Sequence, residues 1–189
     1  MIKLVKILGI VGAALPYLFI ITSIVLSPWF DLYENALSDL GSISRNGYIA
    51  YIFNLGLIIS GSLVSLFALI LSNLKRSWKF LIWTTLLLIN AINLALIGVF
   101  NEDAGGIHGI ISIVFFVTTI AIMFVYSYLS WPLNCPRIGA LALLFGLASV
   151  FIWFVKWPWG NVAIQECATA IMASFWLILV SLKNVQTAP

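Results

Sequence analysis

Charged residues are scarce in this chain of 189 residues, at only 8% of the sequence. A water-soluble globular domain carries about 25%. The mean hydropathy is correspondingly high, at +1.15, so we expect an all-α polytopic membrane protein. The nine Lys and Arg residues form no stripe that could follow a phosphate backbone, which excludes nucleic acid as a partner.

Histidine and cysteine are scarcer still, with one His and two Cys. A single histidine excludes haem ligation by paired histidines. One His with two isolated Cys cannot complete a zinc site of the usual four-ligand kind. Cys135 is expected at the inner side and Cys167 towards the outer side, too far apart for a disulfide. We therefore expect no cofactor and assign no metal ligand.

Six apolar segments are each long enough to cross a bilayer, which takes about 20 residues. Together they form a single transmembrane domain over residues 1–189. The expected helices are 7–27, 47–72, 80–100, 107–130, 138–157 and 160–182. A tight turn at Pro158-Trp159 is expected to join the last two. Small residues such as Gly56 and Gly61 recur inside the segments, where they let helices approach closely in lipid.

Acidic and basic residues separate along this topology. All six acids map to the odd-numbered connections or to a helix end beside one, whereas the basic residues map to the termini and the even-numbered connections. Only Arg45 and Lys156 join the acids. Because cytoplasmic loops are enriched in Lys and Arg, both termini are predicted to be cytoplasmic in a multi-pass protein of the cell membrane. The acids then mark the outer face.

Polar side chains inside the apolar segments gather in the outer half of the bilayer. With a rise of about 1.5 Å per residue, Asn54, Asn93 and Glu166 lie roughly 9–10 Å below the outer helix ends. Ser112 lies slightly nearer the surface, and Asn90 is one turn below Asn93 on the same face. Polar groups in hydrocarbon need partners, so one cavity open to the outer side is predicted to satisfy them.

Glu166 is the strongest single signal, because an isolated buried carboxylate either takes up a proton or finds a cationic partner. Two interpretations are open. In the first, Glu166 forms a structural pair with Lys156 across the last hairpin. In the second, Glu166 is an acid/base or ligand-binding group.

His108 begins the fourth segment and lies four residues before Ser112, on the same helix face. Glu102 and Asp103 come just before it. A carboxylate that orients a histidine is typical of a hydrolase or a metal site, and Asp103 or Asp39 is predicted to orient His108. The alternative is a structural, hydrogen-bonded histidine at a helix start.

The first outer connection contains the segment Ser38-Asp39-Leu40-Gly41. A short interfacial helix is predicted here, ended by Gly41 in a left-handed cap. Asp39 is either a solvated loop acid or the partner of Arg45. The residues that could cap the next helix are Ser42, Ser44 and Asn46.

Three motifs of this chain occur together in one family. They are Asn35-Ala36-Leu37-Ser38-Asp39-Leu40-Gly41, Asn54-Leu55-Gly56 with Gly61, and the acidic turn leading to His108-Gly109 and Ser112. Together they resemble an uncharacterised family of small six-helix prokaryotic membrane proteins, domain of unknown function 998. A proline often precedes the acidic turn in that family, whereas this chain reads Val99-Phe100-Asn101-Glu102. A more distant likeness is to the DRAM-like membrane proteins. The resemblance implies that Asp39, Asn54 and His108 share one site, and it supplies no established reaction.

Three functions are compatible with these features. The first is an outward-facing pocket that binds or processes a lipid or other amphiphile, with membrane-embedded hydrolysis by His108 as general base as one form. The second is a non-enzymatic subunit or scaffold with a membrane-protein partner or as a homo-oligomer, and the third is a small-solute transporter. The candidate catalytic residues are His108, Asp39 and Glu166. The candidate ligand-binding residues are Asn54, Asn93, Ser112, Asp103, Arg45 and Lys156. The expected partners are membrane lipids.

Overall fold

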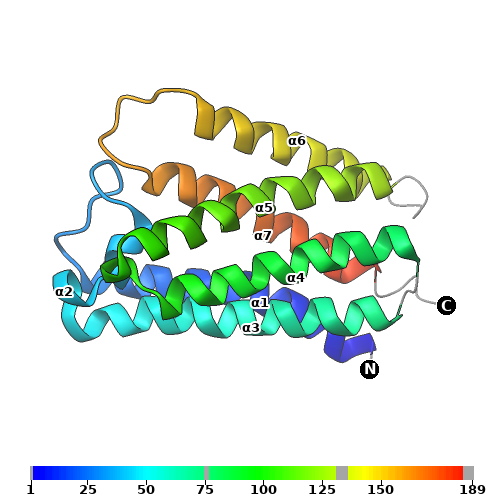
Figure 1. The fold of residues 1–189 in the computed structure, drawn as a ribbon, viewed down its shortest axis with the longest axis horizontal. Helices are drawn as coiled ribbons and strands as arrows, with labels where there is room; N and C mark the ends of the chain where they lie inside the picture. Colours follow the sequence, from blue (N-terminus) through cyan, green and yellow to red (C-terminus); the bar gives the residue numbers. More distant parts are fainter. Residues whose placement is uncertain (1, 75–76, 131–135, 185–189) are drawn as a thin grey trace.

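A computed structural model describes residues 2–74, 77–130 and 136–184 and consists of helices and their connections (Figure 1). The long helices are α1 (Ile2–Leu26), α3 (Ala50–Leu74), α4 (Trp78–Val99), α5 (Gly106–Ser130), α6 (Pro136–Phe154) and α7 (Ala163–Asn184). The short ones are η1 (Leu37–Gly41), α2 (Ile43–Asn46), η2 (Gly47–Ile49) and η3 (Glu102–Ala104). None of the described residues lies in a strand. The all-α fold with six membrane-spanning helices is confirmed; Cys135 lies outside the described residues.

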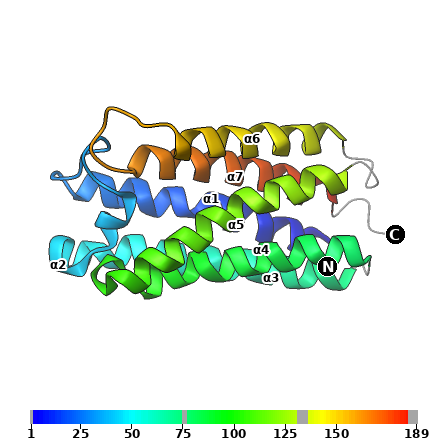
Figure 2. The same cartoon turned by 45° about the horizontal axis from the view of Figure 1, so that its top comes forward.

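The six long helices form a ring in which each helix packs against its neighbours in the sequence, and α7 returns to α1. The start of α1 and the end of α7 lie at the same end of the bundle (Figures 1 and 2). The first outer connection, η3 and the segment 155–162 lie at the opposite end. All the acidic residues outside the long helices belong to that opposite end, which we call the acidic end.

Small residues allow the helices of this ring to touch. A Cβ added at Gly61 of α3 would lie 2.6 Å from the carbonyl oxygen of Ala91 and from the amide nitrogen of Ala95 in α4. A Cβ at Gly56 would overlap the side chain of Phe19 in α1. The predicted packing role of these two glycines is therefore confirmed, and it matters because apolar burial does not drive helices together in lipid.

Aromatic side chains fill the half of the bundle that lies away from the acidic end. Trp83, Tyr126 and Trp176 come from three helices, with ring centroids 5.1–6.3 Å apart. All three are buried and pack in tilted or edge-to-face arrangements, which aromatic pairs favour. This cluster closes the bundle interior on the side away from the acidic end.

The connection between α6 and α7 is longer than the sequence suggests. The predicted tight turn at Pro158-Trp159 is wrong, because α6 ends at Phe154 and α7 begins only at Ala163. The indole nitrogen of Trp157 donates to the carbonyl oxygen of Ile152 (2.8 Å), which satisfies one of the last carbonyls of α6. The amide nitrogen of Gly160 donates to the carbonyl oxygen of Tyr33 (2.8 Å). These contacts tie the segment 155–162 to the first outer connection.

Candidate functional site

The first outer connection folds inward over the acidic end of the bundle. Leu37 and Leu40 of η1 are buried against Phe53 and Leu57 of α3 and Ile97 of α4. A short helix is present as predicted, but it is a 3-10 helix that includes Gly41. The left-handed cap at Gly41 is wrong.

Position 41 has no room for a side chain, because Asn54 packs directly against it. A Cβ at Gly41 would overlap Oδ1 of Asn54, and Nδ2 of Asn54 donates to the carbonyl oxygen of Gly41 (2.9 Å). Asn54 is 5% exposed and lines neither of the two cavities described below. The structure therefore places Asn54 beneath η1, where it holds the connection down.

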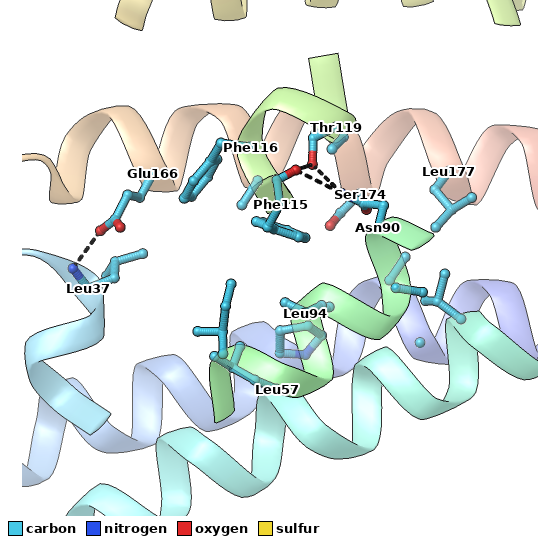
Figure 3. A pocket seen from close by; sticks show the side chains of 18 of the residues that line it. Leu37, Leu57, Asn90, Leu94, Phe115, Phe116, Thr119, Glu166, Ser174 and Leu177 are labelled. Atoms are coloured by element: carbon cyan, nitrogen blue, oxygen red, sulfur yellow. Dashed lines mark hydrogen bonds between the residues drawn. The ribbon is translucent and has the colours of Figure 1, made fainter. Parts of the chain in front are cut away.

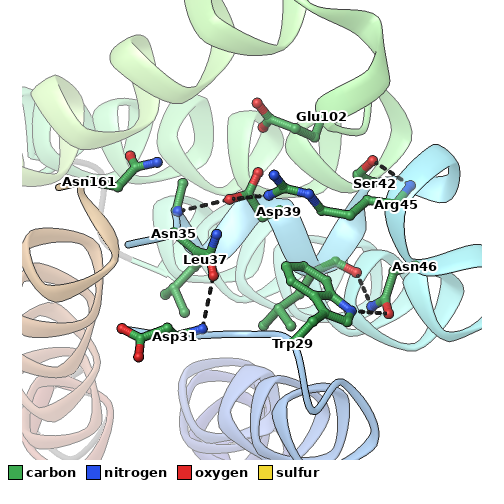
Figure 4. Close-up of polar contacts among 12 residues, drawn as sticks. Trp29, Asp31, Asn35, Leu37, Asp39, Ser42, Arg45, Asn46, Glu102 and Asn161 are labelled. Atoms are coloured by element: carbon green, nitrogen blue, oxygen red, sulfur yellow. Dashed lines mark hydrogen bonds and ion pairs between the residues drawn. The ribbon is translucent and has the colours of Figure 1, made fainter. Parts of the chain in front are cut away.

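Asp39 forms an ion pair with Arg45, with Oδ2 2.8 Å from a guanidinium nitrogen (Figure 4). The same oxygen accepts a hydrogen bond from the amide of Ala36 (3.1 Å). The guanidinium of Arg45 also lies over the ring of Trp29. Ser42, one of the three candidate caps, caps the short helix α2 and not the long helix α3, because its Oγ accepts from the amide of Arg45. The pairing of Asp39 with Arg45 is thus confirmed.

Asp103 binds the first outer connection and not the histidine. Its carboxylate accepts hydrogen bonds from the hydroxyl of Ser42 at 2.7 Å and from the hydroxyl of Ser44 at 2.6 Å. It also accepts from the amide of Ile43 at 2.7 Å. These hydrogen bonds lower the pKa of Asp103 to about 2. The bond from the Ser44 hydroxyl has the largest effect, and the bond from the Ser42 hydroxyl has the next largest. These bonds lock η3 against the start of α2.

The carboxylate beside His108 belongs to Glu102, so the predicted orientation by Asp103 or Asp39 is wrong. Nδ1 of His108 lies 2.7 Å from the carbonyl oxygen of Phe100, and Nε2 lies 3.0 Å from Oε2 of Glu102 and 3.2 Å from Oγ of Ser112. A carbonyl can only accept, so Nδ1 carries a proton. The hydrogen bond from His108 lowers the pKa of Glu102 below its usual range.

Glu166 contacts η1 and not Lys156, so the predicted ion pair is wrong. Its Oε2 accepts a hydrogen bond from the amide of Leu37 (2.7 Å), and the residue is 8% exposed. Lys156 is exposed on the long α6–α7 connection and belongs to neither of the ion pairs found among the described residues. The longer connection explains the difference, since a tight turn would have brought the two side chains together.

Four of the predicted residues line one cavity of about 570 Å³ at the acidic end. Its polar wall is formed by Asp39, Glu102, His108, Ser112 and Glu166. Its apolar wall is formed by Ile113, Val117, Ile120, Trp153 and Phe154. We call this space the outer cavity because it lies nearer the acidic end than the second cavity described below. Its volume falls within the range of about 300–1,000 Å³ that is typical of small-molecule sites.

The outer cavity lies where α5 and α6 separate. The end of α5 meets the start of α6, and their other ends diverge towards the acidic end in both views (Figures 1 and 2). The cavity residues Ile113 and Val117 of α5 are 65% and 60% exposed, and Phe154 of α6 is 86% exposed. The apolar wall of the cavity therefore continues onto the lateral surface of the bundle.

A second cavity of about 130 Å³ extends from the first into the ring (Figure 3). We call it the inner cavity. The residues that line both cavities are Ser38, Ser112, Phe116 and Glu166. Its remaining lining is mostly apolar, and most of its few polar groups bind one another. Tyr17, for example, donates to Ser174 (2.9 Å), and Nδ2 of Asn90 contacts Thr119 (2.8 Å).

Asn90, and not Asn93, is the amide that lines the inner cavity. Asn93 donates to the carbonyl oxygen of Ile89 in its own helix and lines neither cavity. The pairing of Glu102 with His108 was not predicted from the sequence. The two residues are separated by the 3-10 turn η3, so their distance along the chain does not indicate that their side chains meet. Within the described ranges, no group of three or more His, Cys, Asp or Glu residues could hold a metal ion.

Comparison with known proteins supports the resemblance seen in the sequence. A family model described as "Protein of unknown function (DUF998)" matches residues 10–183. No curated protein and no solved structure matches the chain. The likeness to DRAM-like proteins therefore stays a prediction.

Proposed function

We propose, for a chain that belongs to the DUF998 family of proteins of unknown function, that the outer cavity binds an amphiphilic, lipid-like molecule from the membrane. The observation that carries the proposal is the division of the cavity lining. One wall presents carboxylates and a histidine, and the other presents aliphatic and aromatic side chains. A molecule with a polar head and a hydrocarbon chain matches both walls at once.

The opening between α5 and α6 supports entry from the side. The apolar wall reaches exposed residues that would face lipid once the bundle is in a bilayer, such as Val117 and Phe154. An amphiphile could then move its head group into the cavity while its chain stays in hydrocarbon. Because the acidic end lies opposite the Lys-bearing start of α1, we assign the cavity to the outer leaflet of the cell membrane.

Binding is favoured over hydrolysis by the surroundings of His108. A general base acting on Ser112 needs a free lone pair on Nε2. However, Nε2 lies closer to the Glu102 carboxylate than to the Ser112 hydroxyl, at 3.0 against 3.2 Å. Two acceptors at this distance would repel each other, so a proton lies between them. That proton occupies the lone pair which a base would use.

Transport is less compatible with this structure. The inner cavity ends near Trp176, whose ring packs against Trp83 and Tyr126. A solute would have to pass this buried aromatic cluster to reach the other side.

A role as a subunit of a larger complex makes a different prediction, namely that a second protein co-purifies at fixed stoichiometry.

The proposal can be tested by filling the cavity from a position with free space. Gly109 of α5 lines the outer cavity, and a Cβ there has no neighbour within 4 Å. Gly109→Phe should therefore fill the cavity without disturbing the helix packing. Gly106→Phe is the matched control, because Gly106 also has no neighbour within 4 Å and lines neither cavity.

The measurement is the lipid content of protein purified in a mild detergent, determined by mass spectrometry of the extracted lipids. The wild type and Gly106→Phe are expected to retain a stoichiometric amphiphile, and Gly109→Phe is expected to lose it. Equal lipid content in all three proteins, or none above the detergent background in the wild type, would contradict the proposal.

A further inference from the structure

The three carboxylates of the outer cavity differ in their partners. Asp39 is paired with Arg45, and Glu102 is paired with His108. Glu166 has no cationic partner in the described part of the chain, and only its Oε2 accepts a hydrogen bond there, from the amide of Leu37. Its buried carboxylate is therefore the one acidic group of the site that the protein leaves without a counter-charge.

Among the described residues, no lysine or arginine lines either cavity. The half-exposed Arg45 is paired with Asp39 and Lys156 is exposed on the α6–α7 connection, so neither of them supplies a cation to Glu166. Because Asp39 and Glu102 each have a cationic partner, the carboxylate of Glu166 is the one that leaves the site acidic when it is ionised. In an apolar environment, such a charge imbalance strongly disfavours an anionic head group and favours a cationic one.

Glu166 also stands where the two cavities meet. Figure 3 shows its carboxylate and Leu37 at one end of the inner cavity, with Phe116 beside them. A group bound to Glu166 would have apolar space on both sides. The inner cavity, at about 130 Å³, is close in size to an engineered cavity of about 150 Å³ that binds benzene. It can therefore take a short hydrocarbon segment but no second head group.

We infer that Glu166 binds the ammonium group of a cationic amphiphile, so that the ligand of the outer cavity carries an amine and not a phosphate or carboxylate at its anchoring end. The inference rests on the proposed function and specifies its ligand. Pairing with an ammonium would supply the counter-charge that a buried carboxylate requires. The hydrocarbon chain would lie along the apolar wall, with the inner cavity open to a substituent near the amine.

The test compares three probes with the same twelve-carbon chain, namely dodecylamine, dodecanol and dodecanoate. Binding to the full chain in non-ionic maltoside micelles at pH 7 is measured by native mass spectrometry. The variants are Glu166→Gln, which keeps an oxygen that can accept from Leu37, and the control Glu34→Gln. Glu34 is an exposed acid at the same end of the bundle and lines neither cavity.

We expect dodecylamine to bind the wild type and Glu34→Gln at least about tenfold more tightly than the other two probes. In Glu166→Gln this preference should disappear. If all three probes bind equally, or if Glu166→Gln keeps the preference for the amine, the inference is overturned while the amphiphile site stands. If none of the probes binds, both proposals fail. Should Glu166→Gln not fold, the ranking of the three probes on the wild type decides the question by itself.

Discussion

The contact between α3 and α4 at Gly61 allows a quantitative prediction for Gly61→Ala. The new methyl group would meet two backbone atoms of α4 at 2.6 Å and the Cβ of Ala95 at 2.9 Å. Ordinary van der Waals contact begins near 3.4 Å, so the helices must separate locally by roughly 0.8 Å. Backbone atoms cannot rotate away as a flexible side chain can. A gap of about 0.5–1 Å already forfeits a quarter to a half of the dispersion energy of each pair that it separates.

Gly61→Ala is therefore expected to lower the free energy of unfolding by about 1–3 kcal/mol. The assay is reversible unfolding by SDS in mixed micelles, followed by tryptophan fluorescence. Gly109→Ala makes the same chemical change where the Cβ has no neighbour within 4 Å. It should be neutral or stabilise by up to about 1 kcal/mol, because Ala is the better helix former. Equal stabilities of the two variants would refute the packing argument.

Three further predictions concern the acidic end. The pKa of Asp103 is depressed to about 2 from 3.8, so its contribution to stability is complete above about pH 4 and is lost as the pH falls towards 2. Asp103→Asn should therefore flatten the dependence of thermal stability on pH in that range, and parallel curves would contradict this. Arg45→Ala removes a half-exposed ion pair with Asp39 and should cost about 0.2–1 kcal/mol, less at high salt. Asn54→Leu leaves the Gly41 carbonyl without its buried donor and should cost about 1–3 kcal/mol, measured by the same SDS titration.

The membrane-spanning helices were predictable because their cause is local. Inside lipid, the backbone of a spanning segment must satisfy its own hydrogen bonds, so a long apolar run becomes a helix whatever its neighbours are. All six predicted segments appear, with ends that differ by a few residues. The path of the chain from α6 to α7 was not predictable, because Gly160 and Asn161 donate to the carbonyl of Tyr33, and Ala163 at the start of α7 donates to the carbonyl of Asn35. No local pattern encodes such a contact.

The direction of the polar side chains was not predictable, and their distance from a helix end was predictable only where that end was. Asn93 lies near its expected distance from the end of α4. Glu166 lies in the first turn of α7, about half as far from the helix end as expected, because α7 begins at Ala163 and not at residue 160. Glu166 faces both cavities, whereas Asn93 bonds to its own helix. The difference is one of rotation about the helix axis, which packing against the neighbouring helices sets.

The sequence by itself therefore determined the fold class, the number of spans and the separation of charges between the two ends. These properties follow from the solvent and from the geometry of a single helix. Only the tertiary structure decided which polar groups meet. It pairs Glu102 with His108 and Asp103 with the start of α2, and it leaves Glu166 without a cation at the junction of two cavities. These pairings depend on the rotation of each helix about its axis and on the paths of the connections. Both are set by contacts between residues far apart in the chain.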